Sequence, residues 1–270
     1  MAGPRCEPTG DSLDDVKSVR TTIRVFEAVA AHQPIGLSEL ARRLEIPKAS
    51  VQRALNSLKE AGWLRQDVAE PGRWVVSARF ALLADAAPAV IAVRERARGP
   101  LSELRAGTGL SVALLILDGD HMTLVGGPDS SEKLRAIEAT LGPLPVHVSA
   151  GGRAILSRLP EATRREVLDR ALRRYTPQSL TDPKAVLAEV AKAKRDGYAV
   201  TRGEFQADVS VVAAAVLDAR QLPVAAVAIF VPDANPAGER LREYGRAVIA
   251  CATSIFGVDP KAADLSAASR

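Results

Sequence analysis

The sequence predicts an α+β protein in which three helices and a β-hairpin precede a larger domain with a central antiparallel sheet covered by helices. Three observations support this prediction. Apolar residues recur at helical spacing between residues 16 and 60, and two β-rich segments around a Pro-Gly turn come next. After residue 100, strand-like and helix-like segments mix irregularly, which disfavours a doubly wound parallel sheet.

Composition and charge limit the classes of protein to consider. The 270 residues suffice for two domains, and an aromatic content of 4% indicates aliphatic cores. The chain shows no signal peptide and no run of the roughly 18 apolar residues that a membrane span needs. Cys6 and Cys251 form no motif, so we expect reduced thiols, a cytoplasmic location and no membrane contact.

We predict five segments, and the positive charge is concentrated in one of them. Residues 16–80 hold eleven Lys or Arg against six Asp or Glu (+5), whereas residues 81–270 hold 24 against 22 (+2). A basic small domain suits binding to phosphates. The segments are a flexible tail 1–13, the small domain 14–78, a linker helix 79–99, the larger domain 100–257 and a flexible tail 258–270.

The small domain begins with one amphipathic helix and continues with two short ones. Val16, Ile23 and Val29 belong to the apolar stripe of the first. A turn ending at Pro47, which suits the first position of a helix, separates the next two. Helices this short are stable only when packed on each other and on a third, which is the helix-turn-helix arrangement. Their apolar positions are Leu37, Leu40, Ala41 and Leu44, then Val51, Ala54, Leu55 and Leu58.

The outward face of the third helix carries side chains that can read DNA bases. Gln52 and Asn56 suit adenine edges, Arg53 suits guanine, and the Ala49 methyl suits a thymine methyl. At the helix start, Lys48 and Ser50 suit phosphate oxygens. The alternative is an ordinary amphipathic helix pair with a solvated polar face.

The flanking segments favour DNA binding over that alternative. Residues 63–68 and 73–77 form two strands around Ala69-Glu-Pro-Gly72, which is the wing of a winged helix-turn-helix. We therefore predict double-stranded DNA as a partner. The wing and the first helix add further candidate contacts to the DNA backbone, namely Arg65, Arg73, Arg20, Thr21 and Arg24.

Residues 79–98 are rich in helix formers, and Pro88 is expected to break or kink the helix. Its apolar surface either pairs with a second copy, which we favour, or packs on its own domain. A dimer places two recognition helices about one DNA turn apart, as a palindromic or pseudo-palindromic operator requires.

The larger domain is predicted from alternating segments. A short helix at 100–105 precedes strands at 111–117 and 122–125 around the turn Asp118-Gly-Asp120. The later elements are strands at 198–201, 209–218 and 224–231, and helices at 150–158, 161–174, 183–195 and 237–256.

Several blocks in the right order resemble the IclR family of transcriptional regulators along about residues 16–257. They are Ser18–Val29, Leu37–Gly62, Leu144–Ala154, Gly197–Glu204 and Val212–Val216. The resemblance implies a GAF-like effector-binding domain, assembly into homodimers or homotetramers, no cofactor, and repression as the commoner behaviour. A small-molecule effector would then shift DNA binding.

The resemblance also implies where the effector binds. His147 and Glu204 either support or line the pocket. A helix begins at Ser149, Ala150, Gly151 and Gly152, and the backbone amides at its start can hold an anion. A close contact between this helix and the sheet explains the glycines equally well. Relatives that bind small polar acids carry polar side chains where this chain has Thr201, Val211, Ala228 and Phe230. Because three of these are apolar, we expect a carboxylate or thioester with apolar bulk, if an effector binds.

Two other functions stay open at this point. The larger domain can serve oligomerisation alone, in a regulator without an effector. An enzyme or metal protein would need His147 and Glu204 as an acid/base pair, or His32, His121 and His147 as ligands. The histidines lack ligand spacing, and the Asp118-Gly-Asp120 turn lacks the rest of a calcium loop, so we expect no metal and no catalysis.

Overall fold

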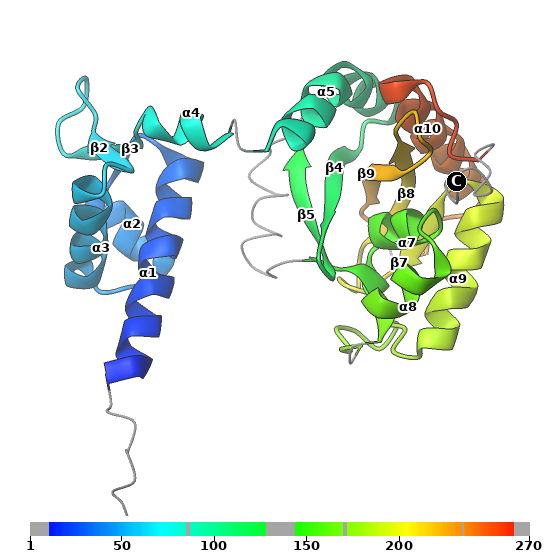
Figure 1. The fold of residues 1–270 in the computed structure, drawn as a ribbon, viewed down its shortest axis with the longest axis horizontal. Helices are drawn as coiled ribbons and strands as arrows, with labels where there is room; N and C mark the ends of the chain where they lie inside the picture. The colour runs from blue at the N-terminus through cyan, green and yellow to red at the C-terminus, as the bar shows by residue number, and fades with distance from the viewer. Residues whose placement is uncertain (1–10, 85–86, 128–143, 170–171, 234, 262–270) are drawn as a thin grey trace, which may run out of the picture. The chain divides into compact units, whose positions relative to one another are not determined.

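A computed structural model describes residues 11–84, 87–127, 144–169, 172–233 and 235–261. Its contacts divide the chain into two compact units, with Pro88 the last residue of the first and Ala89 the first of the second (Figure 1). Most of the two predicted tails lies outside the described residues.

The first unit is a winged helix-turn-helix, as predicted. Helices α1 (Asp11–His32), α2 (Leu37–Leu44) and α3 (Lys48–Glu60) pack around Val25, Leu40 and Leu55. The wing strands β2 (Leu64–Gln66) and β3 (Arg73–Val76) pair antiparallel, and the unpredicted β1 (Ile35–Gly36) pairs with the other edge of β3. Pro47 precedes α3 as its N-cap instead of occupying its first turn.

The segment after the wing differs from the predicted kinked helix. Helix α4 (Arg79–Ala84) ends before Pro88, and α5 (Pro88–Thr108) begins at that proline and runs through Pro100. Proline suits a first helical position because its missing N–H has no partner there. The separate helix expected at 100–105 is therefore part of α5. Its buried stripe Val93, Ala97, Leu101 and Leu104 crosses Pro100, so packing outweighs the cost of that proline.

The second unit is built on a six-stranded sheet in which every neighbouring pair is antiparallel. The strand order is β6-β5-β4-β9-β8-β7. The strands are β4 (Ser111–Asp118), β5 (His121–Gly126), β6 (Leu144–Pro145), β7 (Ala199–Arg202), β8 (Ser210–Leu217) and β9 (Pro223–Val231).

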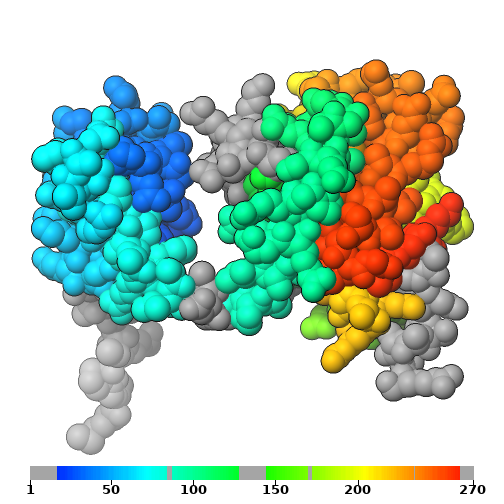
Figure 2. All heavy atoms as spheres, turned by 90° about the horizontal axis from the view of Figure 1, so that it is seen from above, coloured from blue at the N-terminus to red at the C-terminus, as the bar shows by residue number. Residues whose placement is uncertain are grey.

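Helices cover both faces of this sheet. On one face, α5 and α10 (Gly238–Phe256) pack side by side, as Figures 1 and 2 show. The other face carries the 3-10 turn η1 (Val146–Val148), α7 (Ala150–Leu156), α8 (Glu161–Leu168) and α9 (Pro183–Asp196). Helix α8 ends before the predicted position 174, although residues 170 and 171 lie outside the described part. None of the helices in the described ranges is long and apolar enough to cross a membrane.

Candidate functional site

Helix α3 of the first unit has one buried apolar face and one outward polar face, as the sequence predicts. Val51, Ala54, Leu55 and Leu58 are buried against α1 and α2. Lys48, Ala49, Arg53 and Asn56 are exposed, and Ser50 and Gln52 are half-buried. A continuous polar face with one cationic side chain near its middle is thus presented to solvent.

Side chains on this polar face form hydrogen bonds with one another. The Gln52 amide nitrogen donates to the Asn56 amide oxygen at 2.9 Å, one helical turn along. The Arg53 guanidinium donates to the Ser50 hydroxyl at 3.1 Å. The amide pair engages one polar atom of each side chain and leaves the other for a base edge, so the face is partly ordered before DNA arrives.

The predicted backbone contacts are less uniform. Arg24 donates to the Leu44 carbonyl at the end of α2 at 3.2 Å. Arg73 donates to the Pro34 carbonyl at 2.9 Å and pairs with Glu70 at 2.7 Å. Both arginines therefore brace the unit. Arg20 and Arg65 are exposed, Arg65 donating to the Gln66 carbonyl, and Thr21 is half-buried.

Sequence reasoning overlooked Arg79, at the start of α4. Its guanidinium donates to the Ala61 carbonyl at 2.7 Å and lies 4.9 Å from the Trp63 ring centroid. This arginine ties α4 to the end of the recognition helix.

In the second unit, a cavity opens on the face of the sheet that carries α7. It encloses about 750 Å³ of empty space, part of it open to solvent. Ten lining residues are apolar and three are polar, and no charged residue is among them in the described part of the chain. They are Leu115, Met122, Leu124, Leu144, Val148, Ala150, Phe205, Val209, Val211 and Phe230, with Ser149, Thr201 and Gln206.

Strand register explains where this cavity lies. Thr201, Val211 and Phe230 are neighbours in one row across β7, β8 and β9. Two residues further along, the row is Ala199, Ala213 and Ala228. Small side chains in the second row let α7 approach the sheet, and the larger first row lines the cavity together with Ser149 and Ala150 at the start of that helix.

Five of the ten predicted effector-binding residues line the cavity: Ser149, Ala150, Thr201, Val211 and Phe230. The other five are not among the lining residues, namely His147, Gly151, Gly152, Glu204 and Ala228; for His147 and Glu204 this favours the supporting role over the lining one. The sequence alone did not identify the wall from β4 and β5 or the segment after β7 that supplies Phe205, Gln206 and Val209. Alternation along the strands was the available signal for the former.

The two glycines of α7 serve close packing. A Cβ atom at Gly151 would lie 2.8 Å from Leu115 Cδ1, and one at Gly152 would lie 2.5 Å from the Val146 carbonyl oxygen. The Gly152 amide donates to the Ser149 hydroxyl at 3.2 Å, and the Arg153 amide donates to the Ser149 carbonyl at 3.0 Å. The Gly152 and Arg153 amides therefore already have acceptors within the protein. Of the two explanations for the glycines, an anion site and close packing, the geometry supports close packing.

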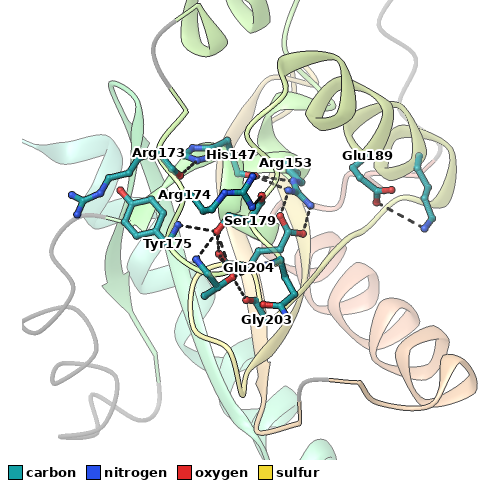
Figure 3. Close-up of polar contacts among 12 residues, drawn as sticks. His147, Arg153, Arg173, Arg174, Tyr175, Ser179, Glu189, Gly203 and Glu204 are labelled. Carbon is teal, nitrogen blue, oxygen red and sulfur yellow. Dashed lines mark hydrogen bonds and ion pairs between the residues drawn. The ribbon is translucent and has the colours of Figure 1, made fainter.

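Behind the cavity, a buried ion pair joins α7 to the segment after β7 (Figure 3). Arg153, 1% exposed, donates through two nitrogens to both carboxylate oxygens of Glu204, with Nη1 to Oε1 at 2.7 Å. Its Nε and Nη2 also donate to the His147 carbonyl at 3.0 and 2.7 Å. The guanidinium is therefore engaged on every nitrogen.

His147 and Glu204 have supporting roles in this network. His147 Nε2 lies 2.9 Å from the Arg173 carbonyl, which can only accept, so this nitrogen carries the hydrogen. Burial lowers the pKa of His147, which keeps the ring neutral. The Glu204 carbonyl accepts from the Ser179 hydroxyl at 2.6 Å and from the Thr176 hydroxyl at 3.2 Å. Neither residue is placed as an acid/base pair at the cavity.

The geometry gives little support to metal or thiol chemistry. No three His, Cys, Asp or Glu side chains gather into a possible metal site within the described ranges. His121 pairs with Asp120 at 2.6 Å in the β4–β5 turn. Burial raises the pKa of the Cys251 thiol to about 12, so a reactive thiolate is disfavoured there.

Comparison with known families matches both units. The model of the IclR helix-turn-helix domain matches residues 18–68, and that of the bacterial transcriptional regulator IclR C-terminal domain matches residues 86–256. The transcriptional repressor IclR of Escherichia coli (strain K12) is 26% identical over 92% of this chain and 91% of the relative. The HTH-type transcriptional regulator BhcR of Paracoccus denitrificans (strain Pd 1222) is 27% identical over 96% and 94%.

Solved structures share the fold. Thermotoga maritima IclR has a TM-score of 0.63 at 20% identity and covers 89% of this chain and 97% of its own. An IclR homologue from Microbacterium hydrocarbonoxydans, complexed with 4-hydroxybenzoate, has a TM-score of 0.63 at 22% identity and covers 91% and 100%.

Proposed function

Because this chain belongs to the IclR family of bacterial transcriptional regulators, in which it is a regulator and not an enzyme, we propose that it represses transcription from a palindromic or pseudo-palindromic operator. The outward polar row of half-buried Gln52 and exposed Arg53 and Asn56 on α3 carries this proposal, since these side chains match base edges in the major groove. The protein would act in the cytoplasm, beside the chromosome.

A small, largely apolar metabolite would modulate operator affinity from the second unit. The cavity supports this, because its wall is mainly aliphatic and aromatic with a few polar groups, as in sites that bind small molecules. A protein of the same fold holds an aromatic molecule, 4-hydroxybenzoate. Such a ligand acts by binding one arrangement of the protein better than another, which shifts the population between them.

The first unit also supports a homodimer, which can assemble further into a tetramer. Val19, Ile23, Phe80, Leu82 and Leu83 are large apolar residues that the unit leaves exposed on α1 and α4. Phe26 and Phe80 join the two helices, with ring centroids 5.8 Å apart. A second copy would cover this surface, and two-fold symmetry of the dimer would match that of the operator.

The first test replaces the central cation of the recognition helix. We expect Arg53→Ala to weaken binding to an operator, selected from random-sequence DNA, by about 1–3 kcal/mol and to relax base preference at one position. The matched control is Arg165→Ala on α8, where an exposed arginine of equal charge pairs with Glu161. Fluorescence anisotropy at fixed salt measures both affinities.

Two results would count against the proposal at different levels. Unchanged affinity and unchanged base preference in Arg53→Ala would remove Arg53 from the base-reading residues. Failure of the unaltered protein to select any sequence would contradict operator binding itself.

A further inference from the structure

Among the residues that the structure describes, no side chain of the cavity wall carries a positive charge. Its polar residues are Ser149, Thr201 and Gln206, and none of the lining residues in the described ranges is Arg, Lys or His. A carboxylate moved from water into such a wall would lose hydration and gain no side-chain counter-charge in return.

Positive groups behind the wall are already engaged. Arg153 gives its nitrogens to Glu204 and to the His147 carbonyl, so its charge is neutralised within the protein. The neutral His147 ring is turned to the Arg173 carbonyl. At the start of α7, the Gly152 amide is bound to the Ser149 hydroxyl. The carboxylate head that the sequence led us to expect therefore finds no cation here.

Two hydroxyl groups do remain to meet a ligand. Thr201 is 4% exposed and lines the cavity, and its side chain makes no hydrogen bond with any described residue. Ser149, also buried, accepts from Gly152 and keeps its own hydrogen to donate. Because Thr201 lines the cavity, an oxygen of the ligand placed beside it can accept a hydrogen bond from its hydroxyl, which favours such a ligand over a purely apolar one.

We propose that the effector binds in an uncharged form, as an ester, lactone, ketone or alcohol whose oxygen hydrogen-bonds the Thr201 hydroxyl while its apolar body fills the rest of the cavity. This inference rests on the proposed effector-responsive function and revises its ligand class. A carboxylic acid would bind only through its small protonated fraction.

Matched acid and ester probes test the charge preference. We would titrate the full-length protein with methyl 2-naphthoate and 2-naphthoate, and with methyl octanoate and octanoate, by calorimetry at pH 7.0 and 8.5. At least one ester should bind with equal affinity at both pH values. The corresponding acid has a pKa near 4 to 5 and is ionised at both pH values, so it should bind at least about a hundredfold more weakly than the ester at pH 7.0. Its affinity should fall about tenfold further for each unit by which the pH rises.

Variants assign the binding to this cavity. Thr201→Val keeps the side-chain shape and removes the hydroxyl, so ester affinity should fall roughly three- to tenfold. The control is Thr253→Val on α10, where the hydroxyl is bound to the Ile249 carbonyl on the other side of the sheet; it should leave ester affinity unchanged. Val211→Arg adds a permanent cation to the wall and should shift the preference toward the acid.

Each outcome decides a specific claim. An acid that binds as tightly as its ester, without pH dependence, overturns the inference and leaves an effector-responsive regulator in place. Failure of both esters to bind also overturns it, and equal effects of Thr201→Val and Thr253→Val place the ester elsewhere and overturn it too. None of these results alters operator binding by α3, which the Arg53→Ala measurement tests independently.

Discussion

At the scale of single residues, the Arg153–Glu204 pair shows how a buried charge is tolerated. Both side chains lie away from water, at 1% and 7% exposure; each is bound to the other, and Arg153 also donates to the His147 carbonyl. Coulombic attraction in such a site must offset the desolvation of two ions. Because the pair joins α7 to the segment after β7, it also positions the neighbouring Phe205 and Gln206 at the cavity.

Removing one charge of this pair should be costly. We expect Glu204→Gln to lower the free energy of unfolding by about 3 kcal/mol, because Arg153 is left charged and buried without a counter-ion. The control is Glu161→Gln, which breaks a pair on α8 whose side chains are 67% and 74% exposed, and which should change stability by less than about 1 kcal/mol. Urea unfolding of both variants measures the difference, and equal losses would contradict a structural role for the buried pair.

Individual site residues were only partly predictable. Polarity drew attention to His147 and Glu204, yet polar residues also serve as internal braces, and the sequence does not show which way they face. Thr201, Val211 and Phe230 were placed through the family resemblance, and strand register brings them into one row. Leu115 and Met122 could not be distinguished from ordinary core residues, because a cavity wall and a packed core use the same side chains.

At the scale of elements, α7 lies close to the sheet because both surfaces are made of small residues. Gly151 and Gly152 face Leu115 and the Val146 backbone, and the strands beneath contribute alanines such as Ala226 and Ala228. The helix has seven residues, so its stability depends on this contact more than on its own hydrogen bonds.

The same glycine substitution should have opposite signs in two helices. Gly152→Ala places a methyl group 2.5 Å from the Val146 carbonyl oxygen, which should cost about 1–3 kcal/mol. Gly107→Ala, in the last turn of α5, meets nothing within 4 Å and should stabilise by about 0.5–1 kcal/mol, since alanine is the better helix former. Thermal unfolding gives both values. A stabilising Gly152→Ala would show that α7 can move away from the η1 turn at little cost.

Element boundaries were least predictable at prolines. The sequence suggests interruptions at Pro88 and Pro100, but only the first begins a helix and the second lies inside one. The sequence predicts the loss of helix stability that a proline causes. It does not predict that the apolar residues of α5 on both sides of Pro100 are buried against the sheet, which keeps the helix continuous. The two-residue strands β1 and β6 were missed because they are too short to show alternation.

At the scale of the whole molecule, the exposed apolar residues of α1 and α4 should control assembly. We expect Leu82→Glu to raise the dimer dissociation constant at least about tenfold, because Leu82 is 71% exposed in the chain alone and would be covered by a second copy. Val68→Glu at the wing tip, 89% exposed, adds the same charge elsewhere and serves as control. Sedimentation of the full chain measures both, and an unchanged constant in Leu82→Glu would place the dimer contact on another surface.

The overall plan was predictable because it depends on patterns that extend over many residues. Helical spacing and the Pro-Gly turn predicted the winged helix-turn-helix, and the mixture of hairpins with helices predicted an antiparallel sheet. The full set of residues that line the cavity was not predictable from the sequence. It arises from residues on β4, β5, β7, β8 and β9 that are far apart in sequence and meet only through strand order.

That strand order also bears on aggregation. The strands at the two ends of the sheet are its shortest, with two residues in β6 and four in β7, whereas the longest, β9, lies between β4 and β8. Short terminal strands expose few unpaired backbone groups to which another chain could add a strand. Within the described part of the chain, the two edges of the sheet thereby offer little backbone for the addition of strands from other molecules.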